Sequence, residues 1–430
     1  MKRLIALALF WPLILSSCAI TPQPPQPARF DQPDAAAAYY NAKRGIDSRM
    51  DAVAMYAKAR QQMSSLPRYS TTSDRVSRPA IGILAVEPGS RTASGWTFLG
   101  PGNIGGRTRA LIFDPADPNT LYAGAVSGGI WKSVDGGASW MPIGDHLTNI
   151  AVNSLAIDPA DPKTLYAGTG EGYFREEVRG TALPLRGNGI FVTRDGGVSW
   201  RQLPFTSGED FLWVNDLVLS RHDPRRLYAA TRSGVWRSLD AGENWSRVVA
   251  TTVKGGCLDL ALRPDAAGDY LFASCGIFEQ ATIYRSERAE MDQPWSAVLT
   301  DPAMSRTTLA IAPSNPSIIY ALAASNLPGP NGQTQNLHAV YRSAQNGDAG
   351  SWTQQVRYDA GDKLSTILLT NPLGAMNPQC LGTQGQGNYT PMGWHCNVIA
   401  VDPRNPDIVW AGGVDLFRSD DAGKSWGVAS

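Results

Sequence analysis

The chain repeats one phrase six times after residue 95, and this repetition restricts its fold more than any other feature. An apolar segment, a Pro/Asp turn and a second apolar segment recur, as in FDPADPNTLYAG from residue 113 and VDPRNPDIVWAG from residue 401. A segment such as IWKS or LFRS follows each copy, and a tryptophan then opens a last segment at residues 140, 200, 245, 295, 352 and 426. Alternating apolar and polar residues predict four short strands in each unit.

Six four-stranded units in tandem predict an all-β protein, a β-propeller whose blades are four-stranded sheets. A β-helix has a much shorter period, and a β-sandwich does not repeat the same turn six times. The 43 glycines, 30 prolines, 13 tryptophans and 14 tyrosines also favour short strands and tight turns over long helices.

One strand-like segment, Gly95–Leu99, resembles the fourth strand of a unit, such as Ser351–Gln355, but precedes the first unit. Such a strand normally belongs to the last blade of a ring, whereas the sixth unit has its own fourth strand beginning at Ser425. We therefore expect six readable blades of a seven-bladed ring, in a sequence truncated at its C-terminal side. A six-bladed ring with a spare strand is the alternative.

The N-terminus has the pattern of an export signal. Lys2 and Arg3 precede an apolar run from residue 4 to 15, which is too short for a membrane span. The following Ser16-Ser17-Cys18 resembles a bacterial lipobox, in which the cysteine receives the lipid. Because Ala19 rather than an aspartate follows, the resemblance implies an outer-membrane lipoprotein that faces the periplasm or the cell surface. An ordinary signal peptide is the alternative.

These patterns predict four regions along the chain. Residues 1–17 form the lipoprotein signal peptide, and the proline-rich residues 18–33 form a solvated tether. Residues 34–92 form a short helical and polar spacer, and residues 93–430 form the propeller.

Four cysteines remain after Cys18, an even number in an oxidising compartment. We favour the pairs Cys257–Cys275 and Cys380–Cys396 among the three possible pairings, because each closes a short loop; four free thiols are the alternative. The cysteines and the 4 histidines lack zinc-ligand spacing, so we expect no metal and no cofactor. The formal net charge is zero with no basic run in the body of the chain, which argues against nucleic-acid binding.

An octet with the pattern Ser/Thr-x-Asp-x-Gly-x-x-Trp occurs four times between the third and fourth strands of a unit, and the fourth and fifth units carry drifted copies. It resembles the Asp-box, or bacterial neuraminidase repeat. Its residues are Ser133, Asp135, Gly137 and Trp140; Thr193, Asp195, Gly197 and Trp200; Ser238, Asp240, Gly242 and Trp245; and Ser419, Asp421, Gly423 and Trp426. We interpret the octet as a structural turn, since aspartate accepts turn amides and glycine permits a positive φ.

The whole pattern resembles bacterial propellers of the sortilin and Asp-box glycosidase-like group. This group includes sialidases, xyloglucan-cleaving endoglucanases, sortilin-type receptors and photosystem assembly factors, so the fold alone does not set function. The Arg-Ile-Pro motif of sialidases is absent. In the xyloglucanases the resemblance places a catalytic aspartate after the second strand of the first blade, where this chain has Val126.

The remaining functional candidates lie on the propeller face opposite the octets. The enlarged loop 168–189 combines carboxylates, guanidiniums and aromatic rings, and the next loop on that face adds two more candidates. The candidate ligand-binding residues are Glu171, Tyr173, Arg175, Glu176, Arg179, Asp210 and Trp213. We predict a lipid-anchored module that binds a protein, peptide or carbohydrate. The alternatives are a glycoside hydrolase, with Glu171 as an acid/base candidate, and a solvated loop without a ligand.

Overall fold

The computed structural model describes residues 107–144, 147–173, 185–253, 255–328, 334–358, 368–371 and 390–429, together with residues 58, 62, 68–70 and 75–77. The predicted signal peptide, Cys18 and the tether lie outside the described residues. Of the predicted spacer, Lys58 and Gln62 are helical, and β1 (Arg68–Ser70) pairs with β2 (Arg75–Ser77) in an antiparallel hairpin that the sequence had not indicated. In the part of the chain that the structure describes, no helix is long and apolar enough to cross a membrane.

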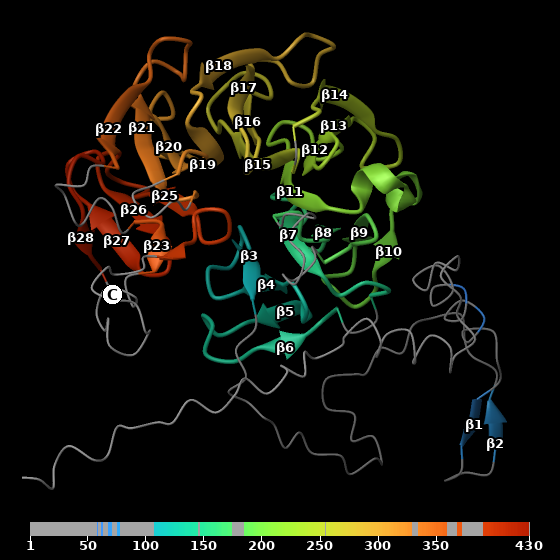
Figure 1. Cartoon of the computed structure of the whole chain (residues 1–430). Coiled ribbons are helices and arrows are strands. Elements are labelled where there is room, and N and C mark those ends of the chain that lie inside the picture. The colour runs from blue at the N-terminus through green and yellow to red at the C-terminus, as the bar shows by residue number, and fades with distance from the viewer. Residues whose placement is uncertain are drawn as a thin grey trace, which may run out of the picture. The chain divides into compact units, whose positions relative to one another are not determined.

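Six four-stranded antiparallel sheets follow one another along the chain (Figure 1). The first three are β3 (Thr108–Phe113), β4 (Leu121–Ala125), β5 (Gly129–Ser133) and β6 (Met141–Pro142); β7 (Val152–Ile157), β8 (Leu165–Thr169), β9 (Ile190–Thr193) and β10 (Arg201–Gln202); and β11 (Val214–Leu219), β12 (Leu227–Thr231), β13 (Gly234–Ser238) and β14 (Ser246–Ala250). The last three are β15 (Cys257–Leu262), β16 (Leu271–Cys275), β17 (Thr282–Ser286) and β18 (Ser296–Thr300); β19 (Met304–Ile311), β20 (Ile319–Ser325), β21 (Leu337–Ser343) and β22 (Thr353–Arg357); and β25 (Val398–Val401), β26 (Val409–Gly412), β27 (Leu416–Ser419) and β28 (Gly427–Val428). Short elements complete the set: η1 (Pro204–Ser207), η2 (Glu209–Phe211), and β23 (Thr370–Asn371) paired with β24 (Thr390–Pro391).

The sheets are the blades of a propeller. The first strands β3, β7, β11, β15, β19 and β25 line the centre, and each packs against the first strand of the next blade, except that β25 packs far less against β3. The predicted all-β propeller with six readable blades is therefore confirmed. The segment at residues 95–99, on which the seventh-blade prediction rests, lies outside the described residues.

A bulge interrupts the first strand at the same place in five blades, as between Val214 and Asp216 and between Cys257 and Asp259. A bulge adds one unpaired residue and re-aims neighbouring side chains. Polar residues of these otherwise apolar strands consequently reach the central cavity.

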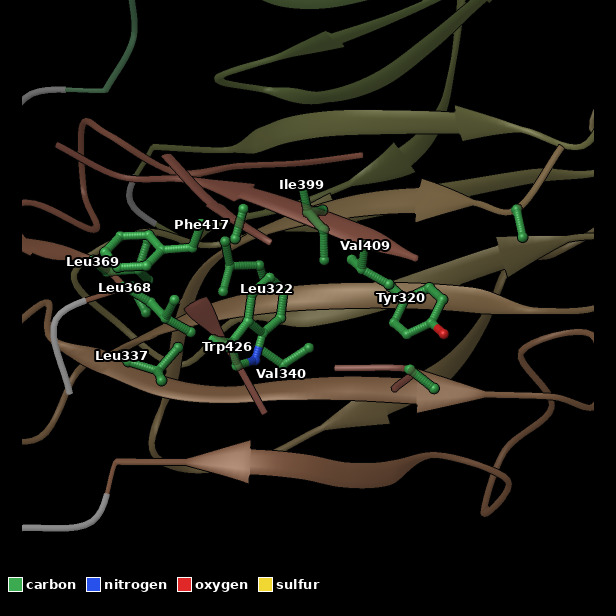
Figure 2. Close-up of a cluster of buried hydrophobic side chains, with 14 of the residues drawn as sticks. Tyr320, Leu322, Leu337, Val340, Leu368, Leu369, Ile399, Val409, Phe417 and Trp426 are labelled. Atoms are coloured by element: carbon green, nitrogen blue, oxygen red, sulfur yellow. The ribbon is translucent and has the colours of Figure 1, made fainter. Parts of the chain in front are cut away.

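Apolar side chains hold neighbouring blades together. Figure 2 shows one such cluster, in which Tyr320, Leu322 and Val340 of the fifth blade pack against Phe417 and Trp426 of the sixth. Burial of each large apolar side chain stabilises the fold by about 1.5–3 kcal/mol. The core is therefore a series of layers between blades rather than one central cluster.

The octets form turns with a shared set of hydrogen bonds. In the first, the Gly137 amide donates to Ser133 Oγ at 2.9 Å, and the Ser139 amide donates to Asp135 Oδ1 at 2.8 Å. These hydrogen bonds, with the Ser139 hydroxyl contributing most, lower the pKa of Asp135 to about 2. Gly137 has a φ of +92°, as a left-handed turn position requires. The octets are thus hydrogen-bonded turns that connect the third strand of a blade to the fourth.

Candidate functional site

A cavity of about 630 Å³ occupies the centre of the ring, and the first strands of all six blades contribute to its lining. Arg107, directly before β3, contributes a polar side chain to its walls, as do these first-strand residues: Arg109, Asn153, Asn215, Asp216, Asp259, Arg306 and Thr308. A volume of this size is typical of sites for small ligands.

Two carboxyl groups from adjacent blades line this cavity. Asp216 accepts the amides of Leu217 and Leu260, each at 2.8 Å, while Asp259 accepts the amide of Leu309 at 2.7 Å. Each carboxyl group therefore bonds a backbone amide on the first strand of the following blade, so the pair also links three blades at the centre.

Burial shifts the titration of both groups. Desolvation raises the pKa of Asp216 to about 6, although two backbone amides oppose the shift. Desolvation, and then the negative charge of Asp216, raise the pKa of Asp259 well above its usual range. Because Asp216 accepts two backbone amides and Asp259 accepts one, the ionised form is more favourable at Asp216. Both carboxyl groups therefore retain a proton to a higher pH than an exposed aspartate does, and the charge of Asp216 extends this for Asp259.

An arginine–glutamate cluster lies at the start of β3. Glu171 is fully buried, and its Oε2 lies 2.7 Å from Nη2 of Arg107. Nε of Arg109 donates to Oε1 of the same carboxylate at 2.9 Å. Two guanidinium groups thus neutralise one buried carboxylate, an arrangement that fixes their positions at the cavity wall.

Tyr173 packs between two cationic groups. The guanidinium carbons of Arg109 and Arg306 lie 4.9 Å and 4.3 Å from the centre of its ring, which is the range of cation–π contact. Nη1 of Arg306 also donates to the carbonyl oxygens of Trp394 and His395, at 3.0 and 2.8 Å. Burial, followed by the positive charge of Arg109, lowers the pKa of His395 to about 4, so this imidazole is neutral at pH 7.

The structure brings two of the predicted ligand-binding residues together at the cavity. Tyr173 forms part of its lining, and Glu171 is buried behind Arg107 and Arg109. The exposed Asp210 and the part-buried Trp213 lie before β11 and outside the lining. The predicted residues Arg175, Glu176 and Arg179 lie outside the described residues. Glu171 itself remains an acid/base candidate only as a prediction, since its carboxylate contacts cationic groups and no solvent.

One predicted disulfide is present, between Cys257 and Cys275 on paired strands. Cys380 lies outside the described residues, so the pair Cys380–Cys396 stays a prediction. Cys396 forms no disulfide with a described cysteine, and its Sγ lies 3.4 Å from Nδ1 of His395. Among the residues that the structure places, no group of histidine, cysteine, aspartate and glutamate side chains could hold a metal ion.

Neither the carboxyl pair nor Arg306 was predicted from the sequence as a functional residue. The available indication was a polar residue inside an apolar first strand, as in VNDLVL at 214–219 and CLDLAL at 257–262. A polar residue at a strand position where the pattern predicts an apolar one often marks a functional or strained position.

Comparison with known proteins finds relatives that are named xyloglucanases. A probable oligoxyloglucan-reducing end-specific xyloglucanase of Neosartorya fischeri is 24% identical over 364 residues, 75% of this chain and 40% of that protein. The xyloglucanase Xgh74A of Acetivibrio thermocellus is 30% identical over 160 residues, 36% of this chain and 19% of that protein. No protein-family model matches the chain.

Solved structures show the same fold. The GH74 xyloglucanase from Xanthomonas campestris has a TM-score of 0.51 and 20% identity, covering 75% of this chain and 45% of that chain. An ancestral GH74 enzyme has a TM-score of 0.52 and 19% identity, covering 76% and 38%. The chain thus spans less than half the length of these relatives.

These findings correct the prediction of a binding module. The curated relatives and solved structures named here are xyloglucanases or GH74 enzymes, so the glycoside hydrolase alternative is favoured over binding without bond cleavage. Val126 stands where the resemblance to xyloglucanases places a catalytic aspartate. This side chain is fully buried, and its amide donates to the carbonyl of Arg107, so the position has a structural role in this chain.

Proposed function

We propose that the protein is a glycoside hydrolase that acts on a polysaccharide of the xyloglucan type, with the central cavity as its active site. The observation that carries this proposal is the pair Asp216 and Asp259, which lines one cavity from adjacent blades and whose pKa values are both raised by burial. The xyloglucanase names of the relatives support the substrate class.

The pair supplies the two groups that glycoside hydrolysis requires. One carboxylic acid protonates the leaving oxygen, and one carboxylate activates water or attacks the sugar. Asp259 is the proton donor in this proposal because its ionised form has fewer backbone amides to stabilise it. Asp216 is the carboxylate, since it accepts two amides and ionises above pH 6.

Polar groups at the cavity wall provide contacts for a saccharide. Nδ2 of Asn153 and of Asn215 donates to a backbone carbonyl oxygen at 2.8 Å, whereas Oδ1 of Asn153 has no hydrogen-bond partner among the described residues and is an acceptor at the wall. Arg107, which remains 40% exposed, provides a donor beside the Glu171 cluster.

Hydrolysis of xyloglucan and its oligosaccharides by the purified protein tests this proposal. We expect release of reducing sugar, with losses of about 100-fold or more in Asp216→Asn and Asp259→Asn, the range of general acid–base catalysis. Glu243→Gln is the matched control, because this carboxylate pairs with Arg201 on an exposed surface. Circular dichroism verifies that each variant folds. Undiminished cleavage by the double variant Asp216→Asn/Asp259→Asn would refute the assignment.

The octets are, in this proposal, Asp-box repeats of a glycosidase-like propeller. Their common hydrogen bonds support this: in each of the four, the glycine amide donates to the hydroxyl oxygen at 2.8–3.0 Å. Their role is structural, so Asp240→Ala should lower the unfolding midpoint and leave the saccharide KM unchanged.

Cys18 carries a lipid in this proposal and attaches the propeller to the outer membrane. The support is the lipobox-like Ser16-Ser17-Cys18 after a short apolar run. Mass spectrometry of the mature N-terminal peptide tests it, with a diacylglyceryl-cysteine expected. A Cys18→Ser chain recovered from membranes in the same amount as the parent would contradict it.

A further inference from the structure

The central cavity is divided by charge. Its carboxyl groups, Asp216 and Asp259, lie on the adjacent first strands β11 and β15. Its guanidinium groups come from two other blades: Arg107 directly precedes β3, Arg109 lies on β3, and Arg306 lies on β19. We call these three arginines the cationic wall. The proposed hydrolysis uses the carboxyl pair and leaves the charge of the cationic wall without a role.

Two of these guanidinium groups converge although they carry the same charge. Nη1 of Arg109 and Nη1 of Arg306 both donate to the carbonyl oxygen of His395, each at 2.8 Å. Both groups also lie against the ring of Tyr173. Burial, and to a smaller extent the positive charge of Arg109, lowers the pKa of Arg306. Because like charges at this separation repel, a negative charge nearby stabilises the arrangement.

The carboxylate of Glu171 compensates only part of this positive charge. It accepts hydrogen bonds from Arg107 and Arg109, whereas it forms no ion pair with Arg306. Nη1 and Nη2 of Arg306 donate to carbonyl oxygens, and its Nε is buried without a hydrogen-bond partner among the described residues. A buried cation without a paired anion is costly. Among the described residues, the cationic wall therefore has more positive charge than Glu171 can neutralise.

The carboxyl pair on the other side of the cavity does not pair with these arginines. Asp216 and Asp259 accept backbone amides instead. Burial raises the pKa of Asp216 to about 6 and that of Asp259 well above its usual range. Asp216 is therefore mostly protonated below pH 6, and the cationic wall then lacks this negative charge as well.

The side chain of Arg107 offers a donor for direct contact with an anion. It is 40% exposed, and Glu171 accepts only its Nε and Nη2, so Nη1 remains available at the cavity wall. A planar guanidinium group matches the geometry of a carboxylate. Oδ1 of Asn153, which lacks a hydrogen-bond partner among the described residues, is an acceptor for a sugar hydroxyl in the same cavity. The cavity thus offers separate groups to a carboxylate and to a hydroxyl.

We propose that the cavity binds a saccharide that contains a uronic acid, with the carboxylate of that sugar at the cationic wall. This inference rests on the proposed function, because it names the substrate of the same cavity more closely. Within the xyloglucan-type class, it favours chains that carry a uronic acid over fully neutral chains. A neutral saccharide leaves the charge of Arg306 uncompensated, whereas a carboxylate beside Arg107 and Arg306 neutralises it.

Isothermal titration calorimetry of the full chain with glucuronate, its neutral methyl ester and glucose tests this inference. At pH 5, where Asp216 is mostly protonated, glucuronate should bind about tenfold more tightly than either neutral sugar. Arg306→Gln and Arg107→Gln should each remove most of this preference and leave the affinity for glucose unchanged. Arg107→Gln keeps the test decisive if the buried Arg306 variant fails to fold. Arg201→Gln is the control, because Arg201 pairs with Glu243 on an exposed surface.

Two outcomes would overturn the inference. One is glucuronate that binds no more tightly than its methyl ester, or not at all. The other is inorganic sulfate that displaces glucuronate as effectively as free glucuronate does, which would identify a site for charge alone. Hydrolysis is measured separately: selective glucuronate binding without cleavage of any saccharide would refute the hydrolytic function alone. Cleavage of neutral xyloglucan oligosaccharides without a preference for glucuronate would refute the uronic acid inference alone.

Discussion

Replacement of Glu171 by glutamine should destabilise the propeller strongly, although the two side chains have the same shape. Glu171 is fully buried and neutralises Arg107 and Arg109, whose side chains are 40% and 13% exposed. Breaking a buried ion pair costs about 3–5 kcal/mol, because the remaining charge stays buried and uncompensated. Because Arg107 is more exposed than Arg109, water can solvate its guanidinium group more readily once the carboxylate is lost. We therefore expect the free energy of unfolding to decrease by about 3 kcal/mol, at the lower end of that range.

Urea unfolding followed by tryptophan fluorescence measures this cost, with Glu243→Gln as the reference. Glu243 and Arg201 are about half exposed, and a surface pair of this kind contributes about 0–1 kcal/mol. The unfolding constant should therefore rise roughly 100-fold in Glu171→Gln, against a few-fold at most in Glu243→Gln. Equal costs in the two variants would refute the view that Glu171 positions the arginines at the cavity wall.

Three further predictions concern the carboxyl pair, the disulfide and the octet turns. Because the folded-state pKa of Asp216 is raised to about 6, this group alone should lower folding stability by up to about 3 kcal/mol as pH rises from 4 to 6. Asp216→Asn should reduce the fall measured in urea titrations at each pH and leave the part that Asp259 contributes; an unchanged slope would contradict the shift. Reduction of Cys257–Cys275 should lower stability by about 3 kcal/mol, because the bond constrains the unfolded chain; an unchanged urea midpoint in dithiothreitol would contradict this. Gly242→Ala should cost at least about 1 kcal/mol more than Gly196→Ala, because both have positive φ but only the former places its Cβ 2.4 Å from a leucine methyl group; equal midpoints in thermal unfolding would argue against this collision.

The propeller fold could be predicted because the four-strand pattern of one blade occurs six times in the sequence. The tryptophan and the octet define the turn between the third and fourth strands, and the structure has that turn where the octet occurs, as at Asp135 and Gly137. The pair Cys257–Cys275 was also predictable, because the ends of antiparallel neighbours lie side by side.

The candidate site could not be predicted in the same way. Asp216 and Asp259 reach one cavity only because bulges re-aim their strands and because the ring brings first strands of different blades together. The raised pKa values depend on burial, which no local pattern encodes. The prediction of a binding module was overturned by the relatives named xyloglucanases, whereas its loop residues Arg175, Glu176 and Arg179 lie outside the described residues.

The initial rate of reducing-sugar release from xyloglucan oligosaccharides, measured between pH 4 and 8, tests the central claim most directly. The proposed mechanism predicts a rate that rises through about pH 6 as Asp216 ionises and decreases at higher pH as Asp259 loses its proton. The Asp216→Asn chain should lose the rise together with nearly all of the rate. A parent protein that releases no sugar at any pH, or an Asp216→Asn chain with the parent's profile, would contradict the assignment of this cavity as a hydrolytic site.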